Sequence, residues 1–116
     1  MQDRDQVYLG HMLDTARQAV ERVRAIERGD FDRDEDLRLA LAHRIQIIGE
    51  AARRVSAEAQ RELSAIPWAE IIGMRHKVIH DYLSVDFDIV WQVVARDLPA
   101  LIAELEKIVP PEPQES

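Results

Sequence analysis

The residues best suited to chemistry are concentrated between positions 75 and 82, where the sequence reads RHKVIHDY. A histidine can take up and return a proton near neutral pH. An arginine is permanently charged and can bind two oxygens of a phosphate. Arg75, His80 and Tyr82 therefore form a plausible set for cleaving a phosphodiester bond of RNA, which supplies its own 2′-hydroxyl nucleophile. The expected products are a 2′,3′-cyclic phosphate, or its hydrolysis product, and a 5′-hydroxyl.

The same stretch also has plainer interpretations. A polar helix face or a partner interface would look similar in sequence. His76 and His80 are four residues apart, a spacing that can place two metal ligands on one face of a helix. Because no cysteine and no ordered set of acidic ligands accompanies them, we expect no metal site and no cofactor. His11 and His43 stand alone and are expected to be surface or satisfied core histidines.

Helix geometry sets a condition on this site. We expect one helix to begin at about Pro67, carry RHKVIHDY and end near Leu83–Ser84. At about 100° per residue, Arg75 and Tyr82 share a face, whereas His80 lies about 140° from Arg75. The three groups therefore meet only if the helix frays at its end or the site is completed from elsewhere. A two-fold homodimer would place two copies across one cleft.

The elements that must position these groups are helical, because apolar residues recur at steps of three and four. One helix is expected from about Arg4 to Arg28, ended by Gly29 and Asp30. A second apolar pattern covers residues 37–55.

The remaining expectations complete an all-α fold. Ser56 is expected to cap a short further helix, and Pro99 to kink or divide the last one. No strand pattern appears. We expect a bundle of four long helices with short extra turns, formed by residues 1–109 as a single domain, and a polar, disordered tail at 110–116.

Composition excludes several classes of protein. The 116-residue chain is 47% hydrophobic and 32% charged, as in a globular domain rather than a disordered segment. It contains no apolar run of membrane-spanning length, no signal-peptide pattern and no cysteine, so we expect a cytoplasmic protein without disulfides.

The net charge of −7 argues at first against nucleic acid, but its distribution changes that interpretation. Residues 38–77 carry seven basic and four acidic side chains, whereas the segments on either side are acidic. The basic segment runs directly into RHKVIHDY. A locally positive cleft on an acidic protein is therefore predicted.

At this point the sequence resembles a known family. Residues 66–91, IPWAEIIGMRHKVIHDYLSVDFDIVW, resemble the HepT-like family of the HEPN superfamily, and residues 45–56, IQIIGEAARRVS, resemble its second-helix signature. The similarity extends from YLGHMLDTARQAVERV to DLPALIAELEKI, nearly the whole chain.

The resemblance implies a dimeric HEPN bundle that acts as a metal-independent endoribonuclease, the toxin of a two-gene toxin–antitoxin module, with tRNA among its candidate RNA substrates. Arg75 and His80 match the catalytic Arg and His of the family motif, and Tyr82 matches the tyrosine that a MntA-type nucleotidyltransferase antitoxin modifies with AMP. Added adenylate would bring negative charge beside the arginine and hinder RNA binding.

One position departs from the family pattern. The residue after the motif arginine is often Asn or Asp, and here it is His76. His76 and Lys77 are candidates for substrate binding. The alternative to a toxin is a non-catalytic subunit that binds the substrate or the nucleotidyltransferase, and the acidic balance of the chain favours that alternative more than it favours the toxin.

Overall fold

The described part of the chain is almost entirely helical. A computed structural model describes residues 1–81 and 84–111, with the backbone alone of His80 and Asp81. The elements follow in this order: α1 (Asp3–Val23), α2 (Arg28–Arg33), α3 (Glu35–Arg54), α4 (Ala57–Glu62), α5 (Trp68–Val78), β1 (Ile79–Asp81), β2 (Ser84–Val85), α6 (Phe87–Gln92), the π-helical turn η1 (Val93–Asp97) and α7 (Leu98–Glu106). The predicted all-α fold class is confirmed.

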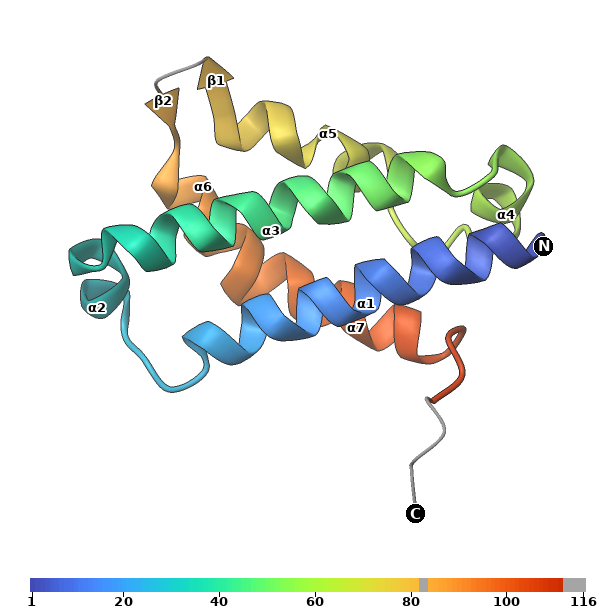
Figure 1. The fold of residues 1–116 in the computed structure, drawn as a ribbon, viewed down its shortest axis with the longest axis horizontal. Helices are drawn as coiled ribbons and strands as arrows, with labels where there is room; N and C mark the ends of the chain where they lie inside the picture. The colour runs from blue at the N-terminus through green and yellow to red at the C-terminus, as the bar shows by residue number, and fades with distance from the viewer. Residues whose placement is uncertain (82–83, 112–116) are drawn as a thin grey trace.

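The long helices form a bundle around one core. Figure 1 shows α1 and α3 running antiparallel, α5 lying along α3, and α7 lying along α1. The short helices α2 and α4 sit at opposite ends of α3, and the β1–β2 hairpin protrudes from the bundle beyond α5 and α6. Each long helix contributes apolar side chains at three- and four-residue steps to this core, as in Leu9, Met12, Leu13 and Ala16 of α1. Among the described residues, no helix combines the length and apolarity needed to cross a membrane.

The first helix ends earlier than its sequence pattern predicts. It stops at Val23 instead of Arg28, and the expectation that Gly29 and Asp30 end it is wrong. These two residues instead lie within α2. The Glu27 N–H donates to Asp30 Oδ2 at 3.0 Å and Phe31 is fully buried, so a local cap and an apolar anchor together stabilise a separate short helix.

The expected cap at Ser56 is confirmed. The Ala59 N–H donates to Ser56 Oγ at 3.2 Å, and α4 follows directly. Pro67 immediately precedes α5 as its N-cap instead of lying in its first turn.

The expected division near Pro99 is also confirmed. The helix widens to the π-helical turn η1, where the Leu98 N–H donates to the Val93 carbonyl, and Pro99 lies in the first turn of α7. Because proline lacks an N–H, it cannot donate to the carbonyl four residues earlier.

The helix that carries RHKVIHDY ends at Val78, five residues before its predicted end near Leu83–Ser84. The expectation that the chain has no strand is therefore wrong as well. Ile79 pairs with Val85 and Asp81 with Ser84 in an antiparallel hairpin, and the Asp86 N–H donates to the Val78 carbonyl at 2.7 Å. Val78 and Ile79, consecutive β-branched residues at the junction of α5 and β1, favour extended backbone once such a partner strand is present.

Candidate functional site

Arg75 lies at a cleft between three helices. It is exposed in the last turn of α5 and makes no ion pair or hydrogen bond with the side chains that the structure describes. The cleft has a volume of about 410 Å³, within the range of small-molecule sites. We call it the Arg75 cleft, and it is lined by Tyr8 and His11 of α1, by His43, Gln46, Ile47, Glu50, Ala51 and Arg54 of α3, and by Arg75.

Close packing of α5 on α3 sets the position of Arg75. A Cβ atom added to Gly49 of α3 would lie 3.3 Å from the backbone oxygen of Ile71, one turn before Arg75. Met74 and Val78 are buried on either side of Arg75 in the sequence. The arginine is therefore presented by a helix that is fixed on its apolar face and exposed on its polar face.

His80 lies in the hairpin that follows α5. Between the pairs Ile79–Val85 and Asp81–Ser84, β1 has one more residue than β2, so His80 is the extra residue of a β-bulge. Bulges bend a strand and re-aim a side chain, and they are frequent beside active sites. The helical angle of about 140° between Arg75 and His80 consequently does not apply, because the helix ends between them.

The far side of the hairpin is anchored by aromatic and charged contacts between α2 and α6. The Phe31 and Trp91 rings lie 5.1 Å apart, and the Arg28 guanidinium lies 5.6 Å from the Phe31 ring centre. Arg28 also pairs with Asp32 at 2.9 Å and with Asp88 of α6. These hydrogen bonds, first that to Asp32, raise the pKa of Arg28.

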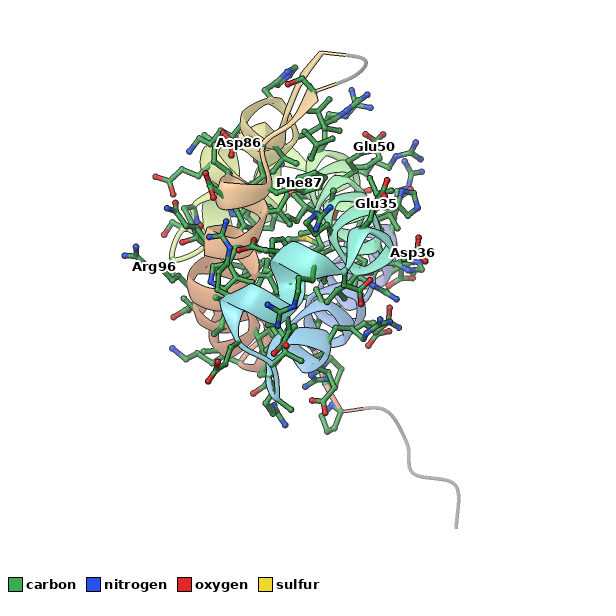
Figure 2. All side chains as sticks on the ribbon, turned by 90° about the vertical axis from the view of Figure 1, so that its left-hand side faces the viewer. Glu35, Asp36, Glu50, Asp86, Phe87 and Arg96 are labelled. Atoms are coloured by element: carbon green, nitrogen blue, oxygen red, sulfur yellow. The ribbon has the colours of Figure 1, made fainter. Side chains whose placement is uncertain are left out.

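A second contact fixes the base of the hairpin on α3. The Arg38 guanidinium lies 5.0 Å from the Phe87 ring centre, and Asp86 Oδ1 accepts a hydrogen bond from the Ile89 N–H at 3.2 Å. Figure 2 shows Asp86 and Phe87 at the base of the hairpin, with Glu50 on the other side of this view. Both ends of the segment that carries His80 are thus attached to α3.

The structure separates the other candidate residues of RHKVIHDY. His76 is exposed in α5 and lines neither the Arg75 cleft nor the hollow on the other side of that helix. Lys77 lines a groove of about 440 Å³ between α5 and the η1–α7 segment, whose rim also carries Glu70, Asp97 and Glu104. Arg75 and Lys77 therefore line different hollows on the two sides of α5.

Two further predictions concern residues around the hairpin. Tyr82 lies outside the described residues. The helical spacing of His76 and His80, on which a two-histidine metal site would depend, is not formed because His76 is in α5 and His80 in β1. Within residues 1–79 and 84–111 no group of three or more metal-ligating side chains is close enough to hold a metal ion.

Sequence reasoning missed four residues that share the cleft with Arg75. His11 and His43, interpreted as surface or core histidines, are both exposed and both line it. Tyr8 lies one helical turn before His11, and Arg54 lies at the end of the α3 face that begins at His43. The spacing of Tyr8 and His11 was the available signal, but it has no meaning until α1 and α3 are known to be adjacent.

Glu50, the acidic residue among the described side chains of the cleft, is already paired. Glu50 Oε1 lies 2.7 Å from Arg53 Nη2 and 3.4 Å from Arg54 Nη2. The hydrogen bond from Arg53 lowers the pKa of Glu50 despite some desolvation. The pKa of Arg54 is raised, first by its hydrogen bond with Tyr8 and then by Glu50. Because one carboxylate faces two guanidinium groups, Arg54 adds to the positive charge that Arg75 brings to the cleft.

A bundle that presents an exposed arginine in a cleft, beside a hairpin carrying a histidine, is suited to binding a phosphodiester. Sequence comparisons agree with this class of protein. Residues 12–108 match the model of the family described as ribonuclease HepT-like. The chain belongs to the HepT-like ribonuclease family of HEPN proteins.

Several curated relatives support this membership. A candidate RNase of Caldanaerobacter subterraneus subsp. tengcongensis is 36% identical over 102 residues, which cover 88% of this chain and 91% of that protein. A candidate RNase of Methanocaldococcus jannaschii is 30% identical over 91% of this chain and 98% of its own length. The probable ribonuclease HepT of Thermococcus cleftensis is 37% identical over 68% of this chain and 72% of its own length. No solved structure gives a significant match to the chain.

Proposed function

We propose that this ribonuclease is an endoribonuclease toxin that cleaves RNA, with tRNA among the candidate substrates, without a metal ion. Arg75 binds the scissile phosphate and stabilises the charge that builds on it, and His80 transfers the proton between the 2′-hydroxyl and the 5′-oxygen. The observation that carries this proposal is Arg75, exposed at a cleft without a partner among the described residues and followed by a bulged hairpin that contains His80.

The decisive experiment is cleavage of total RNA and of tRNA in excess chelator by wild type, Arg75→Ala and His80→Ala, after mass spectrometry has shown that each protein carries no AMP. Arg61→Ala is the matched control, because Arg61 is an exposed arginine of α4, far from the hairpin along α3. We expect cleavage by wild type and Arg61→Ala only. Equal cleavage by all four proteins would contradict the roles of Arg75 and His80.

We further propose that Tyr82 is the site at which a MntA-type nucleotidyltransferase antitoxin adds AMP. A phosphate placed close to Arg75 in sequence would compete with RNA for that guanidinium. The test is incubation of the toxin with the nucleotidyltransferase and ATP, followed by peptide mass spectrometry of wild type and Tyr82→Phe. Modified peptide covering residue 82 in wild type alone is expected, and unchanged modification of Tyr82→Phe would exclude this tyrosine as the single target.

The active form is proposed to be a homodimer. Large apolar side chains of α1 and α3 are exposed, with Val7 at 56% and Leu39 at 47%, and a second copy would cover them. Sedimentation of wild type and of a Val7→Asp, Leu39→Asp double variant tests this assignment. A monomeric wild type at micromolar concentration would contradict it.

The competing function is a non-catalytic subunit that binds a nucleotidyltransferase. The Lys77 groove between α5 and the η1–α7 segment favours it, since that groove combines apolar walls with charges at its rim. Growth arrest when this chain is expressed alone supports the toxin. Absence of growth arrest, together with no RNA cleavage by unmodified, folded protein, would support the binding subunit.

A further inference from the structure

The Arg75 cleft is lined by more side chains able to bind a ligand than cleavage at a single phosphate requires. Among the described side chains, Arg75 lines it from the 75–82 stretch, and the other lining side chains come from α1 and α3. Two of these are imidazoles, His11 and His43, and both are exposed. Exposed histidines on a concave surface cost nothing in desolvation and contribute little to stability, so a structural role does not account for them.

The side chains from α1 are of the type that binds single-stranded RNA. Tyr8 and His11 are one helical turn apart on α1 and line the same cleft. Unpaired RNA bases stack on aromatic side chains, histidine included, and form hydrogen bonds along their edges. Gln46 of α3 offers an amide donor and acceptor for such an edge.

The charges of the cleft favour an anion over an acidic or neutral peptide. Glu50 is neutralised by ion pairs with Arg53 and Arg54 at 2.7 and 3.4 Å. Arg54 keeps further N–H groups of its guanidinium for another acceptor, and the described side chains accept no hydrogen bond from Arg75. Arg54 of α3 and Arg75 of α5 line the same cleft and can therefore hold a phosphate while the histidines and Tyr8 hold a base.

We propose that the Arg75 cleft binds one unpaired nucleotide of the RNA substrate, with its phosphate on Arg54 and Arg75 and its base against Tyr8, His11 and His43. The volume of about 410 Å³ matches one small ligand rather than a helix of a partner protein. The inference rests on the proposed function, because it takes RNA as the substrate. It adds to that function a base-binding subsite built by α1 and α3, outside the 75–82 stretch.

The test separates binding from cleavage. The probe is a fluorescently labelled RNA decamer with 2′-O-methyl groups at every position, which cannot be cleaved through the 2′-hydroxyl, and its Kd is measured by anisotropy at one fixed salt concentration. We expect His11→Ala and His43→Ala each to raise Kd on the order of tenfold, as for loss of one stacking contact. Gln92→Ala, an exposed polar residue of the groove on the other side of α5, is the control and should stay within about twofold.

A second probe distinguishes base contacts from phosphate contacts. A decamer of the same length without bases should bind wild type, His11→Ala and His43→Ala with the same affinity. Arg54→Ala should weaken the binding of both decamers, because its contact is with the phosphate. Thermal melting of each variant confirms that the fold is retained.

Failure of this inference can be told from failure of the proposed function. One outcome would be that wild type cleaves RNA and Arg75→Ala does not, while His11→Ala and His43→Ala bind the decamer as wild type does. This result would contradict the base-binding subsite and support the proposed ribonuclease function. If His43→Ala instead abolishes a dimer without changing Kd, the cleft wall is a contact between copies and the subsite is again wrong. If neither wild type nor any variant cleaves RNA while the histidine variants still lose affinity for the decamer, the result would contradict the proposed ribonuclease function and support the RNA-binding subsite.

Discussion

Two polar sites that include residues of α1, one turn apart, differ in whether the rest of the chain supplies their hydrogen-bond partners. Asp5 is 1% exposed, and its carboxylate accepts hydrogen bonds from the Ser56 N–H at 2.7 Å, the Ser56 hydroxyl at 2.8 Å and the Gln2 N–H at 3.1 Å. The Arg75 cleft, which begins at Tyr8, presents three exposed groups, His11, His43 and Arg75, that have no hydrogen bond or ion pair with the described side chains. A charge satisfied inside the fold stabilises it, whereas an exposed charge without a partner is available to a ligand.

The contact between Asp5 and Ser56 joins the start of α1 to the junction of α3 and α4. The same Ser56 hydroxyl that donates to Asp5 also accepts from the Ala59 N–H and so starts α4. One buried carboxylate thereby fixes the relative positions of three helices. The Arg75 cleft lies between two of these helices, α1 and α3, so its geometry depends on a contact that takes no part in chemistry.

The largest expected effect is on activity at the cleft. Arg75→Ala should lower kcat by about 10²–10³-fold, since it removes a donor that acts on transition-state charge. Its free energy of unfolding should change by no more than about 0.5 kcal/mol, because the side chain is exposed and has no ion pair or hydrogen bond with the side chains that the structure describes. Single-turnover cleavage and urea unfolding measure the two quantities. Arg75→Lys keeps the positive charge but lacks the planar guanidinium that can bind two phosphate oxygens. Full activity in that variant would show that the charge alone is enough for cleavage.

The next effect is on stability at the other site. Asp5→Ala should lower the free energy of unfolding by about 2–3 kcal/mol, because it removes charge-assisted hydrogen bonds and leaves the Ser56 N–H without its acceptor. Asp3→Ala, also in the first turn but exposed, should lose only about 0.3–1 kcal/mol from the helix dipole. Urea unfolding compares them. Equal losses would mean that burial of Asp5 has no special role.

A smaller effect is expected from pH. Burial by itself raises the pKa of Asp5, but the hydrogen bonds from Ser56 and Gln2 outweigh it and hold the pKa below its ordinary value. The stabilisation from ionised Asp5 is therefore complete above the unfolded-state value of about 3.9 and is lost as pH falls below it. Between pH 5 and 3, Asp5→Asn should lose less stability than wild type. Asp3→Asn is the control and should flatten the curve much less than Asp5→Asn, because its exposed carboxylate has only the helix dipole to lose. Parallel curves for all three proteins would contradict the assignment.

The smallest effect compares two glycines of the helices that form the cleft. Gly73 of α5 has no neighbour within 4 Å of an added Cβ, so Gly73→Ala should stabilise the protein by about 0.5–1 kcal/mol. At Gly49 of α3 the added Cβ would lie 3.3 Å from the Ile71 carbonyl oxygen, and Gly49→Ala should give no such gain. Thermal unfolding measures both. Equal stabilisation would show that α5 can move away from α3 without cost.

The parts of the fold predicted correctly depend on local patterns. Apolar spacing located the long helices, the Ser56 side chain capped α4 as expected, and Pro99 fell where the last helix divides. The parts predicted wrongly depend on contacts between distant residues. The end of α5 at Val78 requires the pairing of Ile79 with Val85, which helical periodicity does not reveal.

The candidate site divides in the same way. The sequence by itself determined the family, the helical class and the chemistry of RHKVIHDY, because residue types and short spacings carry that information. Only the tertiary structure decided that His80 lies at a bulge, that Lys77 faces a different groove, and that His11 and His43 share a cleft with Arg75. The physical reason is that α1 and α3 meet through their buried apolar faces, and this packing brings together polar side chains whose separation along the chain gives no sign that they are neighbours.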